Sequence, residues 1–490
     1  MTRLRTPAAD KPRGVGSGVV LFFALASVGV LLVVDGVLPS AYAATGLSNI
    51  TDSFLLVAVA LALFVPGYVR MTRYTPNGGA MYAIVTLGLG RVAGVSVYGL
   101  AITAYLILDL ALYGIFGVQM VAFASAHWGM SPNDPWWPWA LVVWLLVTIA
   151  GQFKIREVGM VLALLTCCEI VITLVISGLG LAHAPAGSLL HPLSLKGMSW
   201  SSLGPALAIA SLGFIGFETT AVYRREARDP RRTVARATYL ALLGSGVVYT
   251  LASWSMSAYY GPHTVEVAQE NSTAMFFALG TPTEATIASV LMLTSLLAAR
   301  IGYSQTWIRL AYVGAVAGMT PAPLARTGSR GVPRTAAGIE SIAGLGAIAV
   351  TQLLHWAPLS QLFYIGGTAG GWAITCILAV TSVAIAAFFR RERHGEPLWA
   401  AVILPTLAAV ALGAASVLAT WHFGTLVGVA PGDKATYALP IVFALIALAG
   451  IGRALYLKVR RPDRYAGLSV AVNEPIRPRT PIAMQPETAR

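Results

Sequence analysis

Apolar and polar positions follow one another along this chain in long blocks. Apolar runs recur over nearly the whole sequence, and short polar segments separate them. At about 1.5 Å per residue, each run is long enough to cross the roughly 30 Å hydrocarbon core of a membrane as a helix. Helices are predicted because a helix satisfies its own backbone polar groups. The pattern predicts twelve spans, at 18–43, 51–70, 93–123, 135–153, 156–181, 199–223, 236–260, 283–312, 334–353, 358–388, 397–423 and 434–458.

Composition and charge then fix the class and the orientation. Hydrophobic residues make up 57% of the 490 positions and charged residues 11%, which excludes a soluble globular protein. With the N-terminus inside, all of the 33 Lys and Arg residues except Lys196, Arg300 and Lys434 lie in or beside cytoplasmic segments. This is the positive-inside pattern. It predicts a multi-pass plasma-membrane protein (inner membrane in a bacterium) with both termini cytoplasmic. The net charge of +13 therefore reflects orientation, and no nucleic-acid partner is expected.

The predicted domain organisation is that of one membrane unit with two halves. Two spans are interrupted: the first by Gly and Pro at 34–39, and the sixth by two glycines at 213–218. Interrupted spans at corresponding places predict an all-α, five-plus-five inverted repeat with a binding site where the breaks meet. The alternative for each break alone is a packing kink. The predicted segments are a cytoplasmic arm (1–17), a first repeat (18–182), a second repeat (199–388), two extra helices (397–458) and a disordered cytoplasmic tail (459–490).

Four stretches of sequence resemble the amino acid–polyamine–organocation permeases. The most specific is GFIGFE at 213–218 with EARDPRRT at 226–233. The others are DGVLPSAYA at 35–43 with TG at 45–46, NGGAMY at 77–82 with GLGR at 88–91, and TSL at 294–296 with Arg309 and AGMTP at 317–321. The resemblance covers most of 18–330. It implies a secondary transporter with a LeuT-type fold and alternating access, coupled to protons or sodium or working by exchange.

The two breaks supply the predicted substrate contacts. A half-helix that begins near Gly36 offers free N–H groups to an anionic group. Free carbonyl groups near Phe214 suit an ammonium group. The predicted substrate-binding residues at the breaks are Val34, Asp35, Gly36, Val37, Phe214, Ile215, Gly216 and Phe217. The resemblance also implies a carboxylate at Glu218, which would gate or accept a proton, and one at Glu169, which we interpret as packing support.

Asp35 is where the chain departs from the family. Many members have small hydroxyl and glycine residues in the first break, and this chain has a carboxylate. That departure favours a cationic amine over a neutral amino acid. Asp35 is predicted to bind the ammonium group or a coupling proton, and the alternative is that it only caps the half-helix.

Asp109 and Arg300 lie near the middle of the third and eighth spans. Ionisable groups at that depth cost roughly 2.5–3.5 kcal/mol each, so opposite charges there predict an internal ion pair. In the alternative, Arg300 pairs with Glu169 and Asp109 stays free. Tyr105 and Tyr113 share a helical face with Asp109, which would suit an amine held by carboxylate and ring, so Tyr105 and Asp109 are also substrate candidates.

Thr294 and Ser295 are the remaining coupling candidates. The resemblance places them where many relatives bind sodium, although adjacent hydroxyls in a membrane helix commonly bond back to their own backbone. The possible coupling ions are therefore H⁺ and Na⁺. No other cofactor and no dedicated metal site are predicted.

The predicted function is a permease for amino acids or related amine-bearing small molecules, with cationic amines favoured. One alternative is a neutral amino acid carrier in which Asp35 is a proton site. Another is a transport-inactive sensor on the same fold. An enzyme is not expected, because the sequence shows no nucleophile–base pair, phosphate loop or metal cluster. The partners are a small substrate and the lipid bilayer, and the sequence leaves the oligomeric state open.

Overall fold

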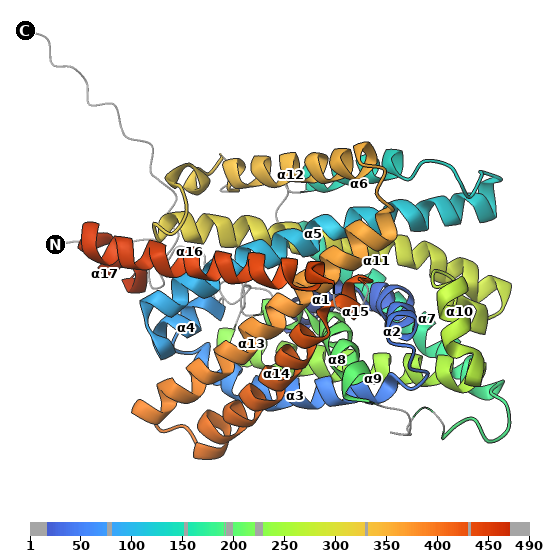
Figure 1. Cartoon of the computed structure of the whole chain (residues 1–490), viewed down its shortest axis with the longest axis horizontal. Coiled ribbons are helices and arrows are strands. Elements are labelled where there is room, and N and C mark those ends of the chain that lie inside the picture. The colour runs from blue at the N-terminus through green and yellow to red at the C-terminus, as the bar shows by residue number, and fades with distance from the viewer. Residues whose placement is uncertain are drawn as a thin grey trace, which may run out of the picture.

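The computed structural model describes residues 17–75, 81–150, 155–190, 192, 199–220, 229–328, 332–429 and 433–470. Residues 1–16 of the predicted arm, 77–80 and 226–228 of the family-like stretches, and 471–490 of the predicted tail lie outside them. Figure 1 shows an assembly of long helices that run side by side, with the elements of the two predicted repeats interleaved.

The predicted spans are helical in the structure. Within the part of the chain that the structure describes, ten helices are long and apolar enough to cross a membrane, and two shorter apolar segments, Leu32–Thr45 and Trp137–Ala150, correspond to the first and fourth predicted spans. The first repeat contains α1 (Ser17–Val28), the π-helix η1 (Leu32–Val37), α2 (Leu38–Thr45), α3 (Thr51–Met71), α4 (Met81–Leu89), α5 (Arg91–Trp128), α6 (Trp137–Ala150) and α7 (Ile155–Ala182). The second contains α8 (Trp200–Phe214), α9 (Pro230–Tyr260), α10 (Thr264–Glu270), α11 (Pro282–Val316), α12 (Arg334–Leu353), η7 (Pro358–Ile365) and α13 (Gly366–Arg391). Beyond them lie η8 (Trp399–Ile403), α14 (Leu404–Trp421), α15 (Phe423–Val427), α16 (Ala438–Arg460) and α17 (Pro462–Val470).

Corresponding elements of the two repeats pack against each other. The third spans, α5 and α11, are in contact, as are the fourth spans, α6 and α12. The first and sixth spans meet where η1 and α2 contact α8. In Figure 1, α6 and α12 form an outer layer above α5 and α11. This pairing is what two halves related by an axis in the membrane plane produce, and it brings both broken spans to the centre.

Several helices are longer than the predicted spans. The third span was expected to end at 123, but α5 continues to Trp128 and contains 38 residues, which is about 57 Å of helix. Since the hydrocarbon core is only about 30 Å thick, α5 must be tilted or must project beyond it. Hydropathy alone cannot find such an end, because the helix continues after the apolar run has stopped.

Two structured segments lie at opposite ends of the molecule. In Figure 1, α10 and α2 lie at one end, and α4 and α17 lie at the other. The predicted disorder of 459–490 is wrong for α17, because its Leu468 is only 3% exposed and packs with Val95, Ala317 and Leu457. The guanidinium of Arg91 also stacks on the Tyr465 ring, 5.1 Å from its centroid.

Candidate functional site

The break in the first span lies at Gly29. α1 ends at Val28, and Gly29 has a φ of 72°, a left-handed conformation that favours glycine. The helix restarts at once, as η1 and then α2. The predicted position, 34–39, was therefore wrong: it is helical throughout. Pro39 lies directly after the π-helical turn, where η1 passes into α2, and the helix continues through it.

This shift changes the surroundings of the predicted contacts in the first span. Val34 and Val37 are buried in helix, and Gly36 faces Ile115 and Phe363. The Gly36 carbonyl accepts a hydrogen bond from the Ser40 hydroxyl. A π-helix inside a membrane span is itself a frequent mark of a functional segment. The backbone N–H groups that the first break presents to Glu169 nevertheless belong to Val30 and Leu31.

Asp35 also lies away from the break. Its side chain is 1% exposed, and its Oδ2 accepts a hydrogen bond from Nε2 of Gln119 on α5 at 3.2 Å. The backbone of Phe276, in the segment after α10, lies near the same carboxylate. Asp35 is thus enclosed between the first span, α5 and the segment after α10.

Glu169 on α7 faces the first break. Its Oε2 accepts the backbone N–H group of Leu31 at 3.5 Å and the hydroxyl of Ser295 on α11 at 2.7 Å. A carboxylate at the start of a half-helix is favourable, because the free N–H groups there carry partial positive charge. The adjacent Thr294 bonds back to the Leu291 carbonyl at 2.8 Å. Only Ser295 of the predicted hydroxyl pair therefore points to the break, and a carboxylate stands beside it.

The break in the sixth span lies at the predicted place. α8 ends at Phe214, Ile215 is extended, and Gly216 has a φ of 123°, which L side chains rarely adopt. Phe217 begins a 3₁₀ turn that reaches Thr220. Phe214, Ile215 and Phe217 line a narrow apolar pocket together with Leu61, Ser211, Thr375, Leu378 and Leu412.

Glu218 and three tyrosines close this second break. Oε2 of Glu218 accepts the N–H group of Gly216 at 2.9 Å, and Oε1 accepts the hydroxyl of Tyr105 at 2.6 Å. The backbone carbonyls of the unwound turn accept hydrogen bonds from side chains. Tyr303 donates to the Ile215 carbonyl at 3.3 Å, and Tyr68 donates to the Glu218 carbonyl at 2.8 Å. Side chains from three other spans, α3, α5 and α11, thus bond to the unwound turn of the sixth span.

Of the two ion pairs that the sequence allowed for Arg300, the structure contains the pair with Asp109. Glu169 bonds to Ser295 and Leu31 instead. Nη1 of Arg300 bonds to Oδ1 of Asp109, and Nη2 bonds to Tyr113 Oη at 2.5 Å and to Glu340 Oε1 at 2.7 Å. We call these four residues the Arg300 cluster. Tyr105 does not join Asp109 around a common ligand, because its hydroxyl is bonded to Glu218.

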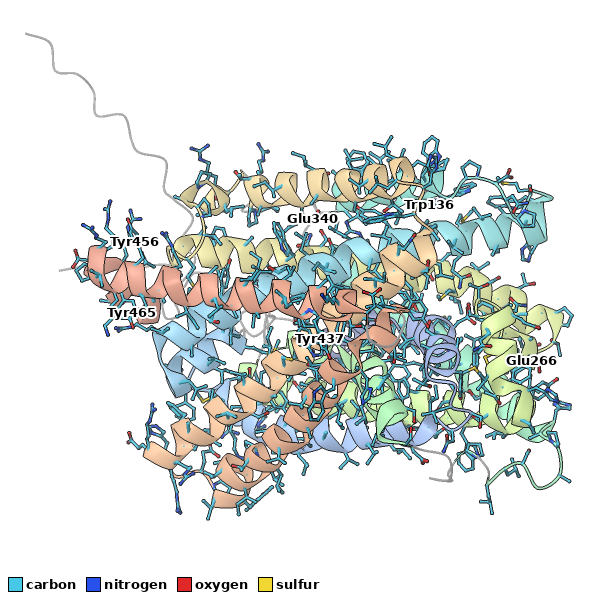
Figure 2. The ribbon with its side chains drawn as sticks, viewed as in Figure 1. Trp136, Glu266, Glu340, Tyr437, Tyr456 and Tyr465 are labelled. Carbon is cyan, nitrogen blue, oxygen red and sulfur yellow. The ribbon has the colours of Figure 1, made fainter. Side chains whose placement is uncertain are left out.

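Glu340 was missed by sequence reasoning. It lies on α12, and Figure 2 shows it on the side of that helix nearest α5 and α11. The available signal was a carboxylate within a predicted span, which is costly without a partner. Within the described ranges, no group of three or more His, Cys, Asp or Glu residues is placed to hold a metal ion.

Comparison with known proteins identifies the family. The family model "Amino acid permease" matches residues 18–451. The chain is 21% identical over 369 residues to the branched-chain amino acid permease BcaP of Lactococcus lactis, an alignment that covers 71% of this chain and 76% of that protein. Its fold is similar to the crystal structure of a mutant manganese transporter from Eremococcus coleocola, with a TM-score of 0.55, 12% identity, and coverage of 93% and 94% of the two chains. The chain therefore belongs to the amino acid permease family.

Proposed function

We propose that this permease is a secondary active transporter of amino acids or related amine-bearing small molecules, with cationic amines favoured. The observation that carries the proposal is the carboxylate of Glu218, fixed in the second break by the Gly216 N–H group and the Tyr105 hydroxyl. A carboxylate beside unwound backbone offers an ammonium group both a counter-charge and carbonyl acceptors. The ammonium group would replace Tyr105 at Glu218.

The charge of the central region supports a cationic ligand. Asp35, Glu169 and Glu218 are all buried there, and their hydrogen bonds come from an amide, hydroxyls and backbone N–H groups. The buried base, Arg300, is bonded to two other carboxylates. A cation entering this region would therefore gain more than an anion of the same size.

The way in which the breaks are closed supports an alternating-access mechanism. The bonds from Tyr105 and Tyr303 tie the second break to α5 and α11, so a substrate that competes for the same groups loosens this tie. Binding energy would thereby favour a second conformation, as population shift requires. The broken spans would rock against α5 and α11, which pair as a scaffold.

Glu169 and Ser295 are the proposed coupling site. They bring a carboxylate and a hydroxyl from two spans to the first break. The carboxylate would take a proton, and together with the hydroxyl and the break carbonyls it would offer the oxygen ligands that sodium takes. Glu169→Gln should therefore abolish accumulation driven by whichever ion gradient is used, while counterflow of substrate continues.

A second candidate is a neutral amino acid carrier with Asp35 as the proton site. Two observations favour it: the relative named as a branched-chain amino acid permease, and the position of Asp35 outside both breaks. In that case Glu218 would hold the ammonium group of a zwitterion.

Uptake into proteoliposomes separates these functions. Labelled lysine and putrescine should accumulate in preference to alanine and leucine if the main proposal holds. The assay is run with and without a sodium gradient and with an imposed pH gradient. Preference for leucine would favour the second candidate, and binding without any flux would indicate a sensor.

A further inference from the structure

The Arg300 cluster combines three ionisable groups in a fully buried place. Arg300, Asp109 and Glu340 are 1%, 0% and 3% exposed, and they come from α11, α5 and α12. Arg300 also stacks on the ring of Tyr113, 4.3 Å from its centroid. Asp109 Oδ2 has no hydrogen-bond donor among the described residues. The Asp109 and Glu340 carboxyl groups lie close enough to share a hydrogen bond.

The charges of the cluster do not balance. A guanidinium group keeps its charge in proteins, so one Arg and two carboxylates leave one negative charge without a counterpart. An uncompensated charge at this depth is costly. Two carboxylates on one site also repel each other, and a shared proton removes the repulsion, as it does in other carboxyl pairs.

We propose that Asp109 and Glu340 share one exchangeable proton beside Arg300, so that the Arg300 cluster is a proton-binding site separate from both breaks. The proton comes from water and adds to a carboxylate oxygen, with no other bond made or broken. This inference rests on the proposed transport function, but not on a cationic substrate.

Among the described residues, no other charged side chain forms an ion pair or a hydrogen bond with Asp109, Arg300 or Glu340. Tyr303, on α11, lies within electrostatic reach of Asp109. Glu169 of α7 bonds to Ser295, five residues before Arg300. The other packed elements contribute neutral groups: Trp144 and Thr148 of α6 bond to Ser341, Gly370 of α13 lies against Leu108, and the Pro358 carbonyl of η7 lies against Gly114.

The cluster is one helical turn from two tyrosines that bond to the second break. Tyr105, which bonds to Glu218, precedes Asp109 by four residues on α5. Tyr303, which bonds to the Ile215 carbonyl, follows Arg300 by three residues on α11. Gain or loss of the proton changes the electrostatic attraction between α5, α11 and α12. The resulting movement of α5 and α11 would shift Tyr105 and Tyr303, which close the break. The site therefore acts on transport without lining the substrate path.

Infrared difference spectroscopy on the full chain in lipid nanodiscs, between acidic and alkaline pH, tests the proposal directly. The wild type should lose a carboxylic-acid C=O band on deprotonation. Glu340→Gln and Asp109→Asn each leave Arg300 with one carboxylate, a neutral pair that needs no proton, so either variant should lack that band. Glu266→Gln, on the exposed side of α10, should keep it, and so should Glu218→Gln.

Transport gives the second readout. If the proton must be bound for transport, wild-type uptake falls about tenfold per pH unit on the alkaline side, and Glu340→Gln removes this slope. Absence of any titrating band in the wild type, or an unchanged band and pH profile in both amide variants, would overturn the proposal. The infrared measurement needs no substrate. If the protein transports no amine but shows the band, the proposed function fails and the proton site stands. If it transports amines but shows no band, only the proton site is contradicted.

Discussion

The two helix breaks are built from different chemistry, although they occupy equivalent places in the two repeats. At the first, a carboxylate from α7 covers backbone N–H groups near Leu31, with Ser295 beside it. At the second, the hydroxyls of Tyr68 and Tyr303 donate to backbone carbonyls. The hydroxyl of Tyr105 donates to the carboxylate of Glu218, which belongs to the break itself. Under the proposed function, the first break would serve the coupling ion and the second would serve the substrate.

Removing the glycine of each break has the largest expected effect. Gly216→Ala should cost about 3 kcal/mol, because a φ of 123° is almost restricted to glycine. Gly29→Ala should cost about 1–2 kcal/mol, because a φ of 72° is open to other residues at moderate cost. Thermal unfolding in detergent measures both.

Gly244→Ala on α9 is the matched control, since a Cβ there meets nothing within 4 Å. It should be neutral or slightly stabilising, because alanine favours the helix. Equal losses at residues 29 and 216 would mean that the two breaks are equally strained.

Glu218→Gln should weaken binding of a cationic amine by about tenfold to a hundredfold. This corresponds to about 1.5–3 kcal/mol for a hydrogen bond to a charged group. The fold should persist, because the amide keeps the shape and its oxygen still accepts from Tyr105, although the Gly216 N–H group loses its acceptor. Competition by putrescine against a labelled substrate measures the loss, and Glu266→Gln is the control. If Glu218→Gln lowers the affinity only for neutral substrates, the second break does not bind the ammonium group of a cationic amine as proposed.

Ser295→Ala should lower the apparent affinity for the coupling ion by about tenfold, or about 1.4 kcal/mol, since Glu169 loses a hydroxyl donor. Thr294→Ala should change it little, because that hydroxyl bonds within its own helix. Uptake is measured against sodium concentration and against pH. If the two alanine variants behave alike, the first break has no role in coupling.

Asp35→Asn should have the smallest effect on substrate affinity, less than about twofold, because Asp35 lies outside both breaks. Its amide replacement can still accept from Gln119. If Asp35 is a proton site, pH-driven accumulation disappears while exchange survives. A large loss of affinity for amines in Asp35→Asn would indicate that Asp35 contacts the substrate.

The spans and the second break followed from local pattern, because long apolar runs and Gly216 act on their own stretch of chain. The first break did not, since Gly and Pro at 36 and 39 stand out in sequence but fit a π-helix and the first turn of α2. The effective glycine was Gly29, an ordinary residue in an apolar run. Nor could spacing show that Glu340 completes the Arg300 cluster or that Glu169 faces Ser295. Such contacts depend on which faces of distant helices meet.

The short helix α17 has a practical consequence for anyone who shortens this protein. Its Leu468 fills a small apolar cluster with Val95 of α5 and Leu457 of α16, and Tyr465 covers the side chain of Arg91. A truncation just after Lys458, where the last predicted span ends, would remove α17, expose the apolar side chains of this cluster at the start of α5 and promote aggregation. A stop codon or purification tag placed after Val470 leaves that contact whole.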